Sequence, residues 1–206
     1  IKLANSSVAM ICLSVISVMT VFFEALFSSK KIVKQDLIIG LMVIPGIFLI
    51  NQSLSPDFKI GFWIGILCSV FSAIVASLNK KYLHLLNATG ISWIEITIVC
   101  ILFSLLSLFN FYLDPASKFL PSVSDWIYLA ILSVFCTVIP WVLVIKSMNS
   151  LSAFSTMLVF NLETVYGIIL SIVLLKEHKQ LNILFYLGVF IILASVFVYP
   201  LIKKKQ

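Results

Sequence analysis

The residue with the clearest chemical potential is an acid in the middle of a long apolar stretch. Glu163 lies within the run Asn-Leu-Glu-Thr-Val-Tyr-Gly at positions 161–167, and apolar residues flank this run on both sides. If the stretch crosses a lipid bilayer, an ionised side chain there costs roughly 2.5–3.5 kcal/mol, so such residues usually face a bundle interior or a water-filled cavity. Glu163 is therefore a candidate group for binding a substrate or a proton.

Helical spacing extends this candidate site, because residues three and four positions apart share a face of a helix. The stripe through Glu163 contains Thr156, Phe160, Glu163, Gly167 and Ser171, bordered by Tyr166. Asn161 lies on a different face, together with Thr164. We expect Glu163, Asn161, Thr156 and Tyr166 to contribute to a substrate-binding site.

The alternative for Glu163 is a structural acid that pairs with a lysine or amide of another helix, or that desolvation keeps protonated. The alternative for Asn161 is a hydrogen bond that joins neighbouring helices.

Two further candidates for substrate binding lie in other apolar stretches. Trp141 follows Pro140 well inside its stretch, and a proline there frees a backbone carbonyl and bends a helix. The indole of Trp141 is thus a candidate for facing a cavity. Asn79 ends its stretch directly before Lys80 and Lys81, so it is a candidate for lining a vestibule at the cytoplasmic end.

Other acids and aromatic residues have simpler interpretations. Glu24 and Glu95 lie nearer the ends of their stretches, and Glu24 is within reach of Lys31 or of the aqueous interface. Tryptophan and tyrosine are enriched where a membrane meets water. Interface anchors are therefore the simplest interpretation of Trp63, Trp93, Trp126 and Tyr128.

The composition indicates whether these residues belong to a soluble or a membrane protein. Hydrophobic residues make up 62% of the chain and charged residues 11%, and the mean hydropathy is +1.18. These values lie far outside the ranges of soluble domains. The apolar runs are continuous and near the ~20 residues that cross a bilayer as a helix, whereas a membrane barrel alternates apolar and polar residues. An all-α integral membrane protein is predicted.

About seven transmembrane helices are predicted, one for each apolar stretch. The predicted spans cover residues 5–27, 35–51, 59–78, 92–113, 125–145, 152–175 and 181–201. The second span is short and carries Gly40, Pro45 and Gly46, which indicates a kink or a close helix contact. The longest connection covers residues 114–124, so no soluble domain is inserted and one membrane domain accounts for the chain.

The positive charge predicts the orientation of these spans. All 14 basic residues are lysines, against 8 acids, which gives a net charge of +6. If the spans alternate, nine lysines fall on one face and five on the other, and the lysine-rich face is expected to be cytoplasmic. The basic run at 203–205 then lies inside the cell beside anionic headgroups, so the C-terminus is predicted to be cytoplasmic and a role in nucleic-acid binding is not expected.

No motif for a metal site or an enzyme is present in the sequence. The four cysteines lie in separate apolar stretches without a Cys-x-x-Cys pair, which is typical of small core residues. His84 and His178 are too far apart in sequence to suggest a ligand cluster. Nucleophile-elbow and His-Glu-x-x-His motifs are absent as well. We therefore expect no metal, no cofactor and no enzymatic activity.

A weak internal repeat relates the two ends of the chain. Residues 7–27 align with 153–173 at a spacing of 146, and after a two-residue slip Gly40 aligns with Gly188. Paired spans of this kind are equivalent elements of two structural repeats, which commonly hold a substrate between them near the midplane. Seven spans leave one repeat incomplete at its front, and the chain starts at Ile1 without an initiator methionine. We therefore expect a truncated chain.

Specific residues in the last third resemble the second repeat of EamA-type carriers in the drug/metabolite transporter superfamily. Those carriers typically show an Asn-Leu-Glu-Pro run in the penultimate helix, an acid after it and a glycine in the last helix. Here these positions hold Asn-Leu-Glu-Thr at 161–164, Glu177 and Gly188. Residues 7–46 are similar to the end of the first repeat, and residues 61–81 to the helix that opens the second. Thr164 replaces the usual proline, which leaves this helix straighter.

The resemblance implies a ten-helix, two-repeat fold of which this chain supplies helices four to ten. Residues 1–52 would form the end of the first repeat, with two helices, and residues 59–206 the second repeat, with five helices. Both ends of such carriers are cytoplasmic, which agrees with the orientation expected from the lysines.

The expected function is secondary transport of small polar metabolites, such as amino acids or their analogues, by alternating access between two repeats. Export is the expected direction, and the inner (plasma) membrane is the expected location. The expected partners are the small-molecule substrate and the lipid bilayer. A homodimer that completes the carrier, and a seven-helix receptor or sensor, remain open alternatives.

Overall fold

Nearly all residues that the structure, a computed structural model, describes lie in helices. The described residues are 6–28, 33–53, 56–113, 122–175 and 182–203, and no strand occurs among them. The helices are α1 (Ser6–Ser28), α2 (Lys34–Ser53), α3 (Pro56–Tyr82), α4 (Ala88–Leu113), α5 (Val123–Ser133), α6 (Ile139–Ser147), α7 (Ala153–Leu175) and α8 (Ile183–Lys203). A π-helical turn, η1 (Val134–Val138), joins α5 and α6 into one continuous rod. Each predicted span thus corresponds to one helix or to this rod, and the all-α prediction is confirmed.

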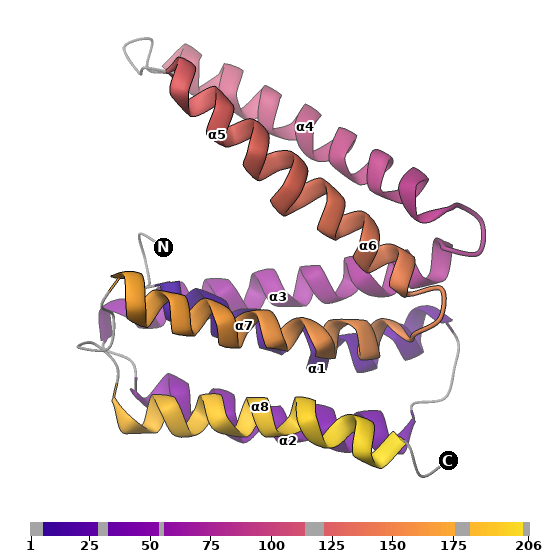
Figure 1. The fold of residues 1–206 in the computed structure, drawn as a ribbon, viewed down its shortest axis with the longest axis vertical. Helices are drawn as coiled ribbons and strands as arrows, with labels where there is room; N and C mark the ends of the chain where they lie inside the picture. The colour runs from indigo at the N-terminus through magenta and orange to yellow at the C-terminus, as the bar shows by residue number, and fades with distance from the viewer. Residues whose placement is uncertain (1–5, 29–32, 54–55, 114–121, 176–181, 204–206) are drawn as a thin grey trace. The chain divides into compact units, whose positions relative to one another are not determined.

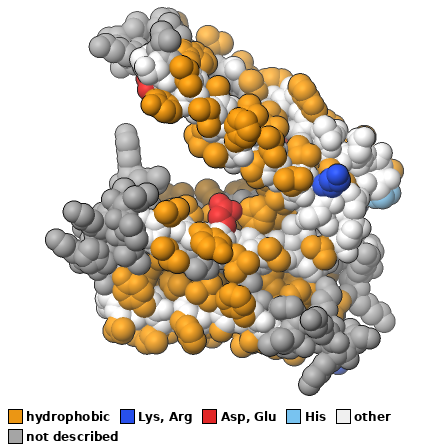
Figure 2. Space-filling model, viewed as in Figure 1, with side chains coloured by type: hydrophobic (Ala, Val, Ile, Leu, Met, Phe, Trp, Pro, Cys, Tyr) orange, Lys and Arg blue, Asp and Glu red, His pale blue; other side chains and the backbone are white. Residues whose placement is uncertain are grey.

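Helix length and composition fit a membrane protein. Five helices are long and apolar enough to cross a bilayer: Val8–Ser28, Phe58–Tyr82, Ala88–Phe109, Ser124–Ser147 and Ala153–Leu170. A shorter apolar helix covers Ile183–Tyr199. Figure 2 shows hydrophobic side chains over most of the described surface of its visible face, with few charged groups among them. This surface suits contact with lipid, in which each helix satisfies its own backbone hydrogen bonds.

The chain divides into two compact units. The first combines residues 1–81 with residues 151–206, and the second covers residues 82–150. In the first unit, α1 packs along α7 and α2 packs along α8, although the members of each pair lie far apart in the sequence (Figure 1). In the second unit, α4 packs against α6.

The α2–α8 contact depends on two glycines that face each other. A Cβ atom added to Gly46 would lie 2.7 Å from the carbonyl oxygen of Gly188, and one added to Gly188 would lie 2.6 Å from that of Gly46. Small residues let membrane helices approach closely enough for backbone contact. The predicted close contact at Gly46 is confirmed, whereas Gly40 faces Val18 and Val21 of α1 at ordinary distances.

The core of the first unit forms where these helices meet. α1, α2, α3, α7 and α8 all contribute to its larger cluster, which contains Val8, Ile11, Cys12, Val18, Val43, Ile50, Phe62, Ile168, Phe185 and Ile192. Cys12 also ties α3 to α1, because its carbonyl accepts a hydrogen bond from Ser69 Oγ at 2.5 Å. Lipid is as apolar as these side chains, so close packing and interhelical hydrogen bonds, rather than burial from water, hold such helices together.

The rod of the second unit begins, and changes from α- to π-helical geometry, at identifiable residues. Ser122 caps α5: its Oγ accepts from the backbone N–H of Asp125, and the carboxylate of Asp125 accepts from the backbone N–H of Ser122. Farther along, Pro140 has no N–H to donate to the preceding turn, and the π-helical turn η1 lies directly before it. Thr137 Oγ1 donates to the carbonyl of Leu132 at 3.1 Å. Pro140 was expected to perturb its helix. The structure shows a local π-helical turn before it, and the rod continues on both sides.

Candidate functional site

Asn161 and Thr164 lie on the face of α7 that packs against α1. Asn161 is only 1% exposed, and its Nδ2 donates to Ser17 Oγ at 3.1 Å. Thr164 is also buried, and its Oγ1 donates to the carbonyl of Met10 at 3.1 Å. Both side chains therefore join α7 to α1 across the contact between these helices, which we call the α1–α7 seam. For Asn161, this is the alternative role considered from the sequence.

Glu163 lies on a different face of the same helix. Its side chain is exposed, as are Tyr166, at 66%, and Val159 one turn earlier, at 56%. Within the described part of the chain, the carboxylate of Glu163 has no hydrogen bond or ion pair. An acid halfway along an apolar helix, without a cation beside it, keeps the chemistry that the sequence indicated: it can bind a cationic group or a proton.

The predicted stripe on α7 is divided by the packing. Thr156 is buried, at 5% exposed, and its Oγ1 donates to the carbonyl of Ser152 at 3.1 Å. Phe160 is half-buried and Glu163 is exposed. The side chain of Ser171 lies outside the described residues. Glu163 and Tyr166 thus share one open face of α7, whereas Thr156 and Asn161 point into packed surroundings.

Glu24 has a partner that the sequence did not suggest. Its Oε2 accepts a hydrogen bond from the backbone N–H of Phe154 at 2.9 Å, across 130 residues of sequence. This N–H belongs to the first turn of α7, where the helix has no internal acceptor. Lys31, the partner considered from the sequence, lies outside the described residues. A carboxylate at the positive end of the helix dipole stabilises this helix start.

Asn79 lies inside α3 and is 5% exposed. Its Nδ2 is buried, and among the described residues it has no hydrogen-bond acceptor. A buried amide without a partner costs free energy, so Asn79 is a donor available to a carbonyl or carboxylate. Its predicted place in a substrate vestibule stays a prediction.

Trp141 and Glu95 form a pair in the second unit. Trp141 Nε1 donates to Glu95 Oε2 at 2.7 Å, which joins α6 to α4 across 46 residues of sequence. Both side chains are half-buried. Trp141 also packs on the buried cluster of Ala88, Ile91 and Ile145. Each residue could be noticed in the sequence, but nothing in the sequence connected them.

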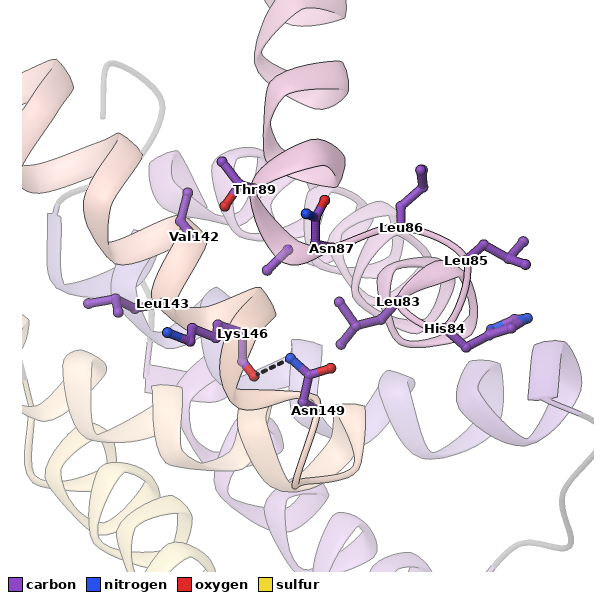
Figure 3. Close-up of a pocket in the computed structure, with 11 residues that line it drawn as sticks. Leu83, His84, Leu85, Leu86, Asn87, Thr89, Val142, Leu143, Lys146 and Asn149 are labelled. Atoms are coloured by element: carbon purple, nitrogen blue, oxygen red, sulfur yellow. Dashed lines mark hydrogen bonds between the residues drawn. The ribbon is translucent and has the colours of Figure 1, made fainter.

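A cavity of about 720 Å³ lies at the end of the same helix pair. Figure 3 shows Asn87, which precedes α4, and Thr89 in its first turn on one side, and Lys146 near the end of α6 and Asn149, which follows it, on the other. Asn149 Nδ2 donates to the carbonyl of Lys146 at 3.0 Å. Lys146 lines this cavity, which lies on the side that the lysines predict to be cytoplasmic.

Metal ligands do not gather in the described part of the chain. There, no group of three or more histidine, cysteine, aspartate or glutamate side chains is close enough to hold a metal ion. Cys12 is buried, and Cys68, Cys100 and Cys136 are exposed. His178 lies outside the described residues.

Comparison with known proteins places these features in a family. The sequence model of the EamA-like transporter family matches residues 59–199, which is more than half of the chain. A relative described as "Uncharacterized transporter YetK", from Bacillus subtilis (strain 168), is 29% identical over 186 residues, which cover 86% of this chain and 54% of the relative. The chain thus spans about half the length of this curated relative. No solved structure gives a significant match.

Proposed function

Since the chain belongs to the EamA-like transporter family, we propose that it exports small polar metabolites, such as amino acids or their analogues, by alternating access. The family and the apolar helices support a multi-pass membrane protein of a transporter family. The substrate class, the direction and the mechanism are the proposed parts. Family membership also favours a carrier over a seven-helix receptor.

The observation that carries the proposal is the open face of α7. Glu163 is an exposed acid halfway along an apolar helix, and Tyr166 lies beside it. A carboxylate binds the ammonium group of an amino acid through charge-assisted hydrogen bonds, which are shorter and stronger than neutral ones. The tyrosine hydroxyl can donate to or accept from the polar remainder of the substrate.

The helix pairing supports alternating access. α1 packs along α7 and α2 along α8, and these are the helices that the internal sequence repeat relates. In carriers built from two repeats, the repeats move against each other around a fixed substrate site near the midplane. The α1–α7 seam, which Asn161 and Thr164 join, would then be one of the contacts at which the two repeats move, while the exposed face with Glu163 meets the substrate.

The proposed location is the plasma membrane with a cytoplasmic C-terminus, because nine of the lysines fall on that face of the predicted topology. The partners are the substrate and the surrounding lipid.

Transport into membrane vesicles of defined orientation tests the proposed substrate and direction. Inside-out vesicles from cells that express the complete protein are mixed with single radiolabelled amino acids, and matched vesicles without the protein serve as the control. An exporter accumulates at least one amino acid in inside-out vesicles. Accumulation in right-side-out vesicles alone would overturn the direction. Uptake equal to the control in both orientations, for the whole set of amino acids, would overturn the substrate class.

A further inference from the structure

The hydrogen bond between Trp141 and Glu95 places a second acid inside a predicted span. The indole Nε1 lies 2.7 Å from Glu95 Oε2, which is a short distance for an N–H donor and typical of a bond to a charged oxygen. Glu95 lies seven residues after the first residue of α4, or ~10 Å along the helix at 1.5 Å per residue. The carboxylate is therefore below the end of the helix and not in the aqueous connection.

No cation neutralises Glu95 in the described part of the second unit. Besides Glu95, the charged or titratable side chains of this part of the chain are Lys146, Asp125, His84, Cys100, Cys136, Tyr82, Tyr112 and Tyr128. None of them forms an ion pair or hydrogen bond with Glu95. Asp125 instead bonds Ser122. The only donor to the carboxylate within these residues is the indole of Trp141.

From this geometry we propose that Glu95 is the site at which the carrier binds and releases a proton, and that Trp141 positions its carboxylate. The proposal rests on the carrier function proposed above and names the ion that is coupled to it. In the binding step, a hydronium ion gives its proton to the Glu95 oxygen that the indole does not contact. The carboxylate becomes a neutral acid, water leaves, and the indole keeps its own N–H.

The single donor to Glu95 is a neutral group. The indole N–H stabilises the charged carboxylate through a charge-assisted hydrogen bond. In the described part of the second unit, no cation holds the carboxylate in an ion pair. Hydrogen bonds to ionised groups are roughly twice as strong as neutral ones, so protonation weakens the tie between α4 and α6.

The surroundings favour a proton over a metal cation. A metal cation needs several oxygen ligands, whereas one oxygen of Glu95 already accepts from an N–H. The buried residues beside the pair, Ile91 and Ile145, offer only hydrocarbon. A proton needs a single oxygen and no further ligand.

The pair lies near a cavity and a π-helical turn. Leu83 and Ala88 line the 720 Å³ cavity and also belong to the cluster on which Trp141 packs, so the cavity borders the cluster beside the pair. Trp141 follows Pro140 and the π-turn η1, and such turns are frequent at functional sites. A change in the strength of the Glu95–Trp141 hydrogen bond would therefore occur next to the π-helical turn η1.

The indole NMR signals of the complete protein in lipid nanodiscs test the proposal without any transport assay. Tryptophan is labelled with ¹⁵N, the signal of Trp141 is assigned by its loss in Trp141→Phe, and pH is varied from about 4 to 9. The Trp141 signal is expected to shift along a single titration curve, and Glu95→Gln is expected to remove this shift. The exposed Trp93, two residues before Glu95, serves as the control signal. A Trp141 signal that stays constant, or that titrates equally in Glu95→Gln, would overturn the proposal.

Transport measured against pH supplies the second test, in case Glu95→Gln does not fold. Trp141→Phe keeps an aromatic ring but removes the donor to the Glu95 carboxylate, so the rate-against-pH curve should differ from that of the wild type. The folded Glu95→Gln protein should show a rate that changes less than twofold over the same range. A Trp141→Phe curve that coincides with that of the wild type would contradict the positioning role. If vesicles transport amino acids but neither curve changes, the carrier function stands and the proton site fails.

Discussion

Asn161 and Glu163 are two residues apart and have different surroundings. The amide of Asn161 is buried and bonds Ser17 across the α1–α7 seam, whereas the carboxylate of Glu163 is exposed on another face of α7. A helix turns about 100° per residue, so a separation of two residues places the side chains on widely different faces. The two polar residues of this motif can therefore have separate roles: Asn161 joins α7 to α1, and Glu163 can meet a ligand.

The helix-joining role of Asn161 predicts a loss of stability on truncation. Asn161→Ala removes the donor to Ser17 Oγ, and interhelical hydrogen bonds in membranes contribute on average ~0.6 kcal/mol and up to ~1.7 kcal/mol. The thermal midpoint of the detergent-solubilised protein should fall by a few degrees. Val159→Ala, on the exposed face of the same helix, is the matched control and should leave the midpoint nearly unchanged. Equal midpoints for Asn161→Ala and the control would show that this bond does not stabilise the seam.

Glu24 predicts a second effect on the same helix. Its carboxylate accepts from the N–H of Phe154 at the start of α7, and the loss of a side-chain cap typically costs ~0.5–2 kcal/mol. Glu24→Ala should therefore lower the thermal midpoint more than Glu24→Gln, which keeps an acceptor oxygen but loses the charge. Hydrogen exchange at the first turn of α7 should increase in the same order. The account fails at this residue if exchange there is the same in both variants and in the wild type.

At the scale of elements, the crossing of α2 and α8 depends on the space between two backbones. A Cβ added to Gly188 would lie 2.6 Å from the Gly46 carbonyl oxygen and 2.6 Å from Ile50 Cγ1. Both distances are shorter than any real Cβ contact, and the carbonyl cannot move without moving its helix.

Gly188→Val should therefore separate α2 from α8 and reduce the amount of folded protein. The measurement is the monodisperse fraction in size-exclusion chromatography of a fluorescent fusion. Gly40→Ala is the control, because its added Cβ would have its nearest contact at 3.5 Å, with a Val21 methyl group. We expect Gly188→Val to lose most of the monodisperse peak and Gly40→Ala to retain it. Retention of the peak in both variants would mean that the helices do not cross at these glycines.

Hydropathy predicted the elements well, and their contacts poorly. The existence of each helix followed from uninterrupted apolar runs, and the ends differ from the predicted spans by only a few residues. The π-turn before Pro140 was not predicted, because a proline indicates that a helix is perturbed but not which of several local geometries results. The Glu95–Trp141 pair was not predicted either, because the two residues are 46 positions apart and only the packing of α4 on α6 brings them together. Glu163 could be identified from the sequence because an acid inside an apolar run is conspicuous. Its exposure could not be predicted, because it depends on which face of α7 packs against α1.

At the scale of the whole molecule, the lysines predict the orientation of all spans at once. Lys80 and Lys81 lie in the last turn of α3 and Lys146 in the last turn of α6, on the face predicted to be cytoplasmic. A green fluorescent protein fused after Gln206 should fluoresce, and an alkaline phosphatase fused within residues 114–121 should be active. Exchanging the two reporters should silence both. Active phosphatase at the C-terminus would reverse the predicted orientation.

The central claim is that this family member is a carrier whose substrate binds at Glu163. The most direct test is amino-acid exchange by the complete protein in proteoliposomes, compared with Glu163→Gln after the two are matched for inserted protein. The variant keeps the size of the side chain but cannot carry a charge. The account predicts measurable exchange by the wild type and a fall of at least tenfold, to the level of empty liposomes, in Glu163→Gln with unchanged insertion. Exchange by Glu163→Gln at the wild-type rate would contradict it.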